Sequence, residues 1–239
     1  MSPEILLVPN DTEAHLEVWK IPKEVDQVPY QILHLRLPSL SKGQFILDIT
    51  CRSAPNPYIH DMPYAPPRPF HTSADNAIIV ISPRFSSSGL IFALFIHRRS
   101  LLDIMKEFSH VNTSSTVSIP WSEWGPPISR WFDTNETRLA GGVAPAGLRW
   151  AFVDTSLGVT DIRIYDFNPH NIYHWNAQED LPSWHIIARK GDNFAHDGVF
   201  AEDVEMGLGC RVYVPTELFD FDAVLMDEER LLGYRVRTR

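Results

Sequence analysis

A strand-like motif recurs at a nearly constant interval along this 239-residue chain and constrains its fold more than any other feature. The motif is a Gly-Leu pair followed by an apolar run, and its copies are 58 and 60 residues apart, beginning at Gly89, Gly147 and Gly207. A second strand-like run follows each copy, with an Asp that lies 14, 14 and 15 residues after the glycine, at Asp103, Asp161 and Asp222. Self-similarity at a fixed period indicates a repeated structural unit.

A weaker fourth copy opens the chain, where the apolar run 5–8 is followed by a polar turn and a second run at 16–20. The distance to the next copy is longer because a Pro-rich segment, 53–74, lies between them. Prolines cannot donate to a sheet ladder, so we expect this segment to be a long surface loop.

Further strand candidates lie between the repeated motifs, at 31–37, 45–51, 77–81, 116–119, 171–175, 184–188 and 231–236. Each period therefore holds about four strands, which is the content of one propeller blade. Segments 45–51 and 77–81 are apolar enough to predict deeply buried strands. The one helix-like stretch, 101–108, coincides with a repeated strand, and the alignment of the repeats favours strand over much of it.

These observations predict an all-β fold, a partial or open β-propeller of about three to four four-stranded blades. We expect a single β-repeat domain over 1–239, with the loop 53–74 and approximate units at 1–52, 75–105, 116–166 and 171–236. Closed propellers usually have about four to eight blades, so the chain is expected to lack blades or to belong to a larger architecture. A β-sandwich is the structural alternative, which the repeat disfavours.

Composition and charge exclude several classes of function. The net charge is −9 and no basic stripe is visible, so we expect no nucleic acid as a partner. The longest apolar run, 90–96, is far shorter than the ~20 residues that cross a bilayer, and residues 1–4 lack the features of a secretory signal. We expect no membrane association. Cys51 and Cys210 lie in apolar runs and predict buried thiols, and thus a cytoplasmic or nuclear protein.

Histidines do not form a convincing metal site. His170 and His174 follow a turn and lie on a predicted strand, where residues four apart are ~13 Å from each other and cannot share one ion. His60, Asp61 and His71 belong to the Pro-rich loop, where ligands would meet only by accident. We therefore predict no metal and no cofactor.

Catalytic motifs are missing as well. Carboxylates occur in two short groups, Glu202-Asp203-Glu205 and 227–229, and the second reads as a hairpin turn with solvated charges. A glycosidase needs two acids that converge on one pocket, which spacing alone does not indicate. No Gly-x-Ser-x-Gly elbow or phosphate-cradling loop is present. We predict no catalytic residue and no enzymatic activity, with a propeller-type glycosidase or hydrolase as the alternative.

The segment 119–132 is unusually rich in aromatic residues and holds Trp121, Trp124 and Trp131. We interpret it as packing between adjacent blades, with Arg130 stacked on a ring or paired with Asp133. The alternative is a binding hot spot, since Trp and Arg dominate such sites.

Three segments resemble, in order, the C-terminal region of F-box proteins that are expanded in mushroom-forming fungi: 119–126 with 130–132, 164–169 and 224–233. The resemblance covers about the second half of the chain. It implies a propeller-like region that selects the targets of a cullin ubiquitin ligase, while an N-terminal F-box helix bundle docks onto the Skp1 adaptor.

The chain departs from this family at its start, because 5–20 predicts a β-hairpin where the F-box would lie. We expect no binding to Skp1. The predicted function is a non-catalytic protein-interaction module, similar to the substrate-recognition half of a fungal F-box protein, that binds a protein target through residues the sequence does not identify. A carbohydrate-binding lectin is a further alternative, suggested by the aromatic content of 11%.

Overall fold

The structure is a computed structural model that describes residues 4–24, 26–54, 75–86, 90–109, 116–134, 145–154, 161–176, 185–188, 190–215, 223–226 and 230–235. Within these ranges the chain is mostly β, with three four-stranded sheets, two two-stranded sheets and three short helices. None of the sheets is closed. The predicted all-β class is confirmed.

The first sheet has the strand order β1-β2-β3-β7. Its strands are β1 (Ile5–Asn10), β2 (His15–Lys20), β3 (Tyr30–Arg36) and β7 (Val117–Ile119). The predicted N-terminal hairpin is confirmed as β1 and β2, and β7 pairs in parallel with β3. Alternate residues face a core on one side, because successive side chains on a strand point to opposite faces.

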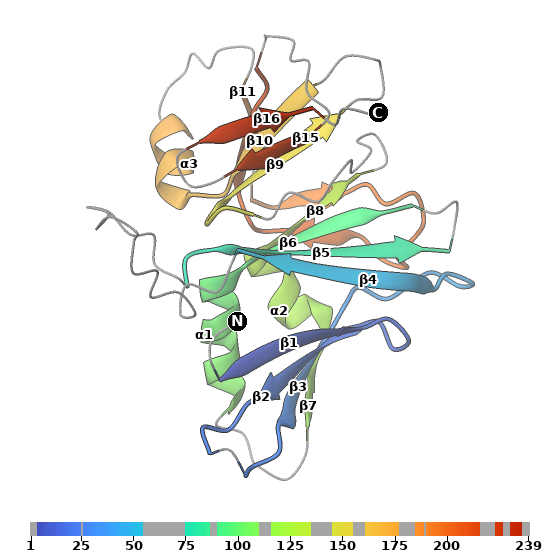
Figure 1. Cartoon of the computed structure of the whole chain (residues 1–239). Coiled ribbons are helices and arrows are strands. Elements are labelled where there is room, and N and C mark those ends of the chain that lie inside the picture. The colour runs from blue at the N-terminus through green and yellow to red at the C-terminus, as the bar shows by residue number, and fades with distance from the viewer. Residues whose placement is uncertain are drawn as a thin grey trace.

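The middle sheet has the order β4-β5-β6-β8 and is antiparallel throughout. It consists of β4 (Ile46–Ser53), β5 (Ile78–Phe85), β6 (Phe92–His97) and β8 (Ser129–Asp133). One face packs on the inner face of the first sheet, around two helices, α1 (Arg98–Ser109) and α2 (Trp121–Ile128), that lie between the sheets (Figure 1).

The third sheet covers part of the other face of the middle sheet. Its order is β11-β14-β10-β9, with β11 (His185–Ala188), β14 (Cys210–Tyr213), β10 (Asp161–Asp166) and β9 (Arg149–Asp154). The second core lies between these two sheets. Its members include Ile78, Val80, Ala93 and Phe95 from the middle sheet and Trp150, Tyr165, Cys210 and Val212 from the third.

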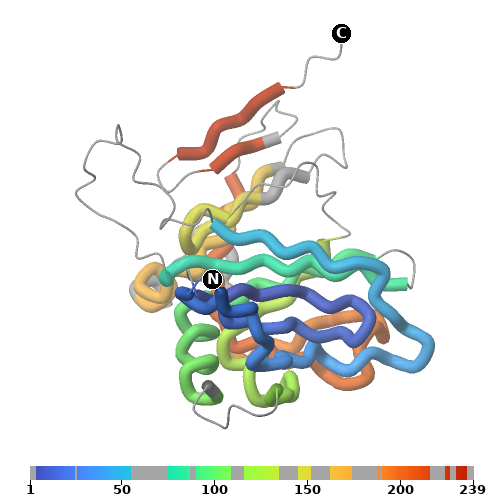
Figure 2. The backbone as a smooth tube through the Cα atoms, turned by 60° about the horizontal axis from the view of Figure 1, so that its bottom comes forward, coloured from blue at the N-terminus to red at the C-terminus, as the bar shows by residue number. Residues whose placement is uncertain are grey.

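Two hairpin-like pairs complete the described structure. β12 (Asp192–Phe194) and β13 (Val204–Met206) pack at the first core, whereas β15 (Ala223–Met226) and β16 (Leu231–Tyr234) pack on the outer face of the third sheet. The sheets therefore follow one another face to face, from the first sheet to β15 and β16, and both views show this order (Figures 1 and 2).

The strand expected over much of 101–108 is wrong, because this segment belongs to helix α1. Leu101 and Met105, four residues apart, are both buried against the first core, which is the spacing of one helix face. His97 immediately precedes the helix, and its ring Nδ1 lies 2.8 Å from the Ser100 hydroxyl in the first turn. The sequence repeat predicted a strand here, although the spacing of Leu101 and Met105 is that of a helix.

The strand expected at 171–175 is also wrong, because α3 (Pro169–Asn176) occupies it. The Asn168 side-chain oxygen accepts a hydrogen bond from the His170 backbone N–H at 3.0 Å, and Pro169 stands in the first helical position. Both features favour a helix start.

The three copies of the sequence motif adopt different structures. The first is a strand followed by helix α1, the second is the hairpin β9–β10, and the third places its strands in two different sheets. The strands of the expected unit 116–166 are distributed over all three four-stranded sheets. Strand pairing across the chain, and not the sequence period, thus determines which strands share a sheet.

The aromatic segment 119–132 forms the end of β7, helix α2 and β8. Trp124 and Trp131 are buried in the first core, and the Trp124 ring N–H donates to the Arg36 carbonyl at 2.8 Å. The packing interpretation is confirmed for these two rings. Arg130 is buried too, and its guanidinium forms an ion pair with Asp192 at 3.2 Å.

Candidate functional site: a polar groove on the middle sheet

A β-bulge near the start of β4 redirects its side chains. The register with β5 shifts between Ile46 and Asp48, so Leu47 is an extra residue in the strand. Ile46 and Ile49 consequently pack against the first core, while the next alternating positions face the other way. The side chains that face the other way are Asp48, Thr50 and Arg52.

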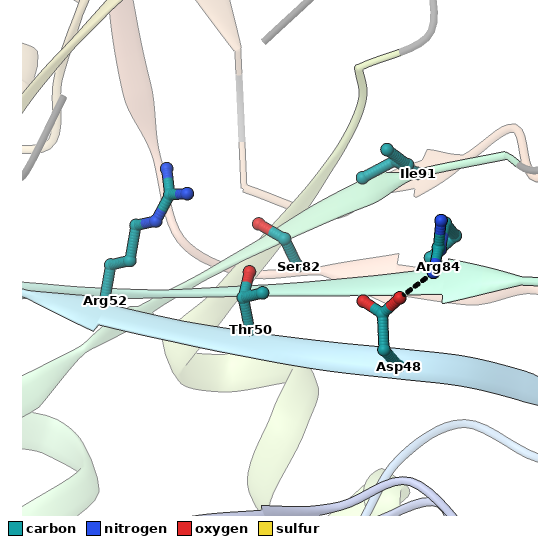
Figure 3. A pocket seen from close by; sticks show the side chains of 6 residues that line it. All are labelled: Asp48, Thr50, Arg52, Ser82, Arg84 and Ile91. Carbon is teal, nitrogen blue, oxygen red and sulfur yellow. Dashed lines mark ion pairs between the residues drawn. The ribbon is translucent and has the colours of Figure 1, made fainter. Parts of the chain in front are cut away.

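These three side chains lie beside polar residues of β5. Asp48 is opposite Arg84 and Thr50 is opposite Ser82 in the strand register. Together with Arg52 and Ile91 they line a groove of about 280 Å³, into which the side chains project from one face of the sheet (Figure 3). Directly opposed pairs on one face of an antiparallel pair are neighbours in space, so the groove is a ladder of paired polar groups.

The charges in this groove are unequally matched. Arg84 forms an ion pair with Asp48, and both side chains are about half exposed, at 50% and 44%. Arg52 is exposed, and in the described part of the chain it has no hydrogen-bond or ion-pair partner. The described lining residues therefore carry two positive charges and one negative charge, a local excess of one positive charge on a protein of net charge −9.

Strand β4 is much less buried than the sequence predicted. Of the expected buried run 45–51, only Ile46 is buried, and Cys51 is exposed, which contradicts the prediction of a buried thiol. The reason is that β4 is the edge strand of the middle sheet. Cys210, on a central strand of the third sheet, is buried as predicted, and burial raises the pKa of its thiol far above the usual range.

A second group of titratable side chains lies on the outer face of the first sheet. The rings of His15 and His34 stack with centroids 4.3 Å apart. The Glu17 carboxylate accepts hydrogen bonds from Asn10 and Trp19 at 2.9 and 2.8 Å, and lies 3.6 Å from the His15 ring. Burial, reinforced by the neighbouring His15, lowers the pKa of His34.

This cluster does not amount to a metal centre. Among the residues that the structure describes, no group of three or more His, Cys, Asp or Glu side chains could hold a metal ion. The stacked pair was not foreseen from the sequence, because His15 and His34 come from different strands and are brought together only by the β2–β3 register. We interpret it as a pH-sensitive packing contact.

The other groups singled out from the sequence lie apart from the groove. His170 is exposed on helix α3, so the strand from which the spacing of His170 and His174 was judged is a helix instead. Glu202, Asp203 and Glu205 are exposed at β13. The remaining candidates, His60, Asp61, His71 and the acidic group 227–229, lie outside the described residues.

The groove itself was missed by sequence reasoning. A signal was present, since Asp48, Thr50 and Arg52 alternate with apolar residues or cysteine, and Ser82 and Arg84 repeat the same spacing on β5. Period-two polar positions in otherwise apolar strands indicate a solvated sheet face. The pairing of β4 with β5 across the Pro-rich segment could not be read from the sequence.

No helix in the described ranges is both long and apolar enough to span a lipid bilayer. No protein-family model matches the sequence, and comparisons with curated proteins and with solved structures find no match either.

Proposed function

We propose that the chain is a non-catalytic protein-interaction module and that the groove of β4 and β5 is its binding surface. The observation that carries the proposal is the ladder of paired polar groups on two strands that ends in Arg52, an arginine with no partner among the described residues. Polar groups held on strands are more precisely placed than groups on loops, and arginine is enriched at protein interfaces.

The architecture we propose for this module is a partial β-propeller. Its support is the succession of three four-stranded sheets packed face to face and followed by the pair β15–β16, with no closed sheet in the described residues. Blades of four strands are the unit of a propeller. The parallel pairing of β7 with β3 departs from the simple antiparallel blade and marks the first sheet as the least regular one.

We further propose kinship with the substrate-recognition half of fungal F-box proteins. The segments that carry the resemblance make structural contacts: Trp124 and Trp131 lie in the first core, and the buried Asp166 carboxylate accepts hydrogen bonds from the Asn168 N–H and the Asn171 side chain at 2.9 and 2.8 Å. The resemblance thus favours a shared architecture over a shared binding site. The target, a protein, would be specific to this chain.

This proposal includes a cytoplasmic or nuclear location, supported by the two free cysteines, and no direct recruitment to Skp1. We expect purified chain and purified Skp1 to elute separately in size-exclusion chromatography. Co-elution as a stoichiometric complex would contradict the proposed absence of Skp1 binding.

The two alternative functions find less support in the groove. A glycosidase requires a pair of carboxyl groups, whereas the described lining contains one, Asp48. A lectin commonly stacks sugars on aromatic rings, and none of the six described lining residues is aromatic.

Selection of a displayed peptide library on the folded chain tests the proposal. Peptides that bind the groove should lose at least about tenfold in affinity for Thr50→Trp, which fills the groove, and keep their affinity for Glu107→Trp, an exposed position on helix α1. Fluorescence polarisation gives the affinities, and urea unfolding verifies that both variants fold. If no peptide is selected, or if Thr50→Trp binds as the wild type does, the groove is not a protein-binding surface.

A further inference from the structure

We propose that the groove recognises an acidic residue of an extended partner segment, with the carboxylate bound by Arg52 and an apolar side chain of the same segment placed near Ile91. This inference extends the proposed function, because it specifies what kind of segment the groove accepts. It follows from the distribution of charge, the length of the ladder and the two different ends of the groove.

The positive end of the groove is Arg52. Its guanidinium is exposed and has no partner in the described residues, whereas the guanidinium of Arg84 is already paired with Asp48. A guanidinium presents a fork of N–H donors that matches a carboxylate with two parallel hydrogen bonds. An incoming anion would therefore bind at Arg52, where it does not compete with an existing ion pair.

The charge of the lining favours a carboxylate over a phosphate group. The six described lining residues have an excess of one positive charge, which one carboxylate neutralises. A phosphorylated side chain carries about −1.5 to −2 at neutral pH and would leave an excess of negative charge next to Asp48. A clustered set of arginines, typical of phosphate recognition, is not found among the described lining residues.

The opposite end of the groove is apolar. Ile91 forms an isolated bridge with Arg84, and Arg84 lies opposite Asp48, so Ile91 and Arg52 stand at the two ends of the ladder. Asp48 and Arg52 are four residues apart on β4, which corresponds to ~13 Å at about 3.3 Å per residue, and Ile91 lies two strands across from Asp48, about 10 Å to the side. Thr50 and Ser82, between the two ends, offer hydroxyl groups to the backbone of a bound segment.

These distances set the spacing of the recognised residues. The line from Arg52 to Ile91 therefore runs diagonally across the groove and is about 16 Å long. An extended partner segment that follows this line advances by about 3.3 Å per residue, so its acidic residue and its apolar residue should be about five positions apart. The acidic residue binds beside Arg52 and the apolar residue contacts Ile91. The hydroxyl ladder itself imposes no particular side chain between them.

The test uses the peptides selected on the intact chain. Selected sequences should share an Asp or Glu and an apolar residue about five positions apart. Replacing that Glu by Gln in a labelled peptide should weaken binding at least about tenfold, and replacing it by phosphoserine should not strengthen binding. Arg52→Gln should lose affinity to the same extent and should no longer distinguish the Glu peptide from the Gln peptide.

The matched control is Lys106→Gln, which removes one positive charge from helix α1 on the opposite side of the middle sheet. It should keep the affinity of the wild type, since exposed charges farther apart than a Debye length are largely screened at physiological salt.

Equal binding of the Glu and Gln peptides, or equal losses in Arg52→Gln and Lys106→Gln, would overturn the inference while leaving a peptide-binding groove intact. Tighter binding of the phosphoserine peptide would assign the groove to phosphorylated partners instead. Failure to select any peptide would instead count against the groove as a protein-binding surface.

Discussion

The face of the middle sheet that packs on the third sheet has two halves, one buried and one exposed to solvent. In one half, Ile78, Val80, Ala93 and Phe95 are at most 2% exposed and pack on the third sheet. In the other half, the alternation along β5 continues with Ser82 and Arg84, and the neighbouring strand β4 contributes the exposed Thr50. The exposed Arg52 lies at the boundary, opposite the buried Val80. Both halves belong to the same antiparallel strands, and the side chains on this face are apolar where the third sheet covers them and mostly polar where the groove lies.

Arginines illustrate the difference between these halves. Arg130, on β8 opposite Phe95, is 3% exposed, donates to the Leu208 carbonyl at 2.6 Å and pairs with Asp192. Burial lowers the pKa of this guanidinium, opposed by Asp192. Arg52 lies on an exposed edge strand without a partner in the described chain. The buried Arg130 links the middle sheet to neighbouring segments, whereas the exposed Arg52 makes no such link among the described residues.

The largest loss of stability is expected for a substitution in the buried, apolar half. Phe95 lies 4.8 Å from the Trp150 ring and 5.0 Å from the Phe167 ring, measured between centroids. Phe95→Ala should lower the free energy of unfolding by about 3–5 kcal/mol, because it removes a buried ring and leaves a cavity between the sheets. Urea unfolding followed by tryptophan fluorescence measures this. A loss below about 1 kcal/mol would mean that the two sheets do not share a packed core.

A smaller loss of stability is expected when the buried Arg130 loses its charged partner. Asp192→Ala removes a partner of the buried Arg130 guanidinium, while its hydrogen bond to the Leu208 carbonyl remains. We expect a loss of about 1–3 kcal/mol in the free energy of unfolding, because a buried charge then loses part of its compensation. Asp192→Asn, which keeps a hydrogen-bond acceptor, should lose less. Equal stability of Asp192→Ala and the wild type would show that Arg130 does not depend on this partner.

Many of the strands could be predicted from the sequence, but which strands pair with one another could not. The hairpin β1–β2 and the buried strand β5 could be predicted, because their apolar patterns are local. The strands expected over much of 101–108 and at 171–175 are helices instead, because Leu101 and Met105 have the spacing of one helix face and Asn168-Pro169 is a helix start signal. The groove depends on a bulge at Leu47 and on long-range strand pairing, which no local pattern encodes.

The ion pair in the polar half should contribute little to stability. Arg84 and Asp48 are about half exposed, and solvent screens such pairs. Arg84→Ala, Asp48→Ala and the double variant should give a coupling energy below about 1 kcal/mol in a double-mutant cycle of urea unfolding. A coupling well above that value would show that the groove is part of the folding core and not a solvated surface.

The smallest effect concerns pH and lies outside both halves, on the first sheet. The pKa of His34 is lowered from 6.5 in the folded protein, so the folded state binds a proton less readily than the unfolded state. The contribution of His34 to the free energy of unfolding is therefore fully present above pH 6.5 and is lost as the pH falls through the lowered pKa of the folded state. His34→Gln should flatten the dependence of unfolding free energy on pH in that range. An unchanged slope would assign the dependence to other groups.

Thiol labelling of two neighbouring positions on β5 tests the contrast between the halves most directly. In a Cys51→Ser background, Val80→Cys places a thiol in the buried half and Ser82→Cys places one in the groove, two residues apart on the same face. The Ser82→Cys thiol should react with a maleimide near the rate of the unfolded chain and be protected by a selected peptide, while the Val80→Cys thiol should react at least about a hundredfold more slowly. Equal labelling rates at the two positions would contradict the division of this face into a sealed core and an open groove.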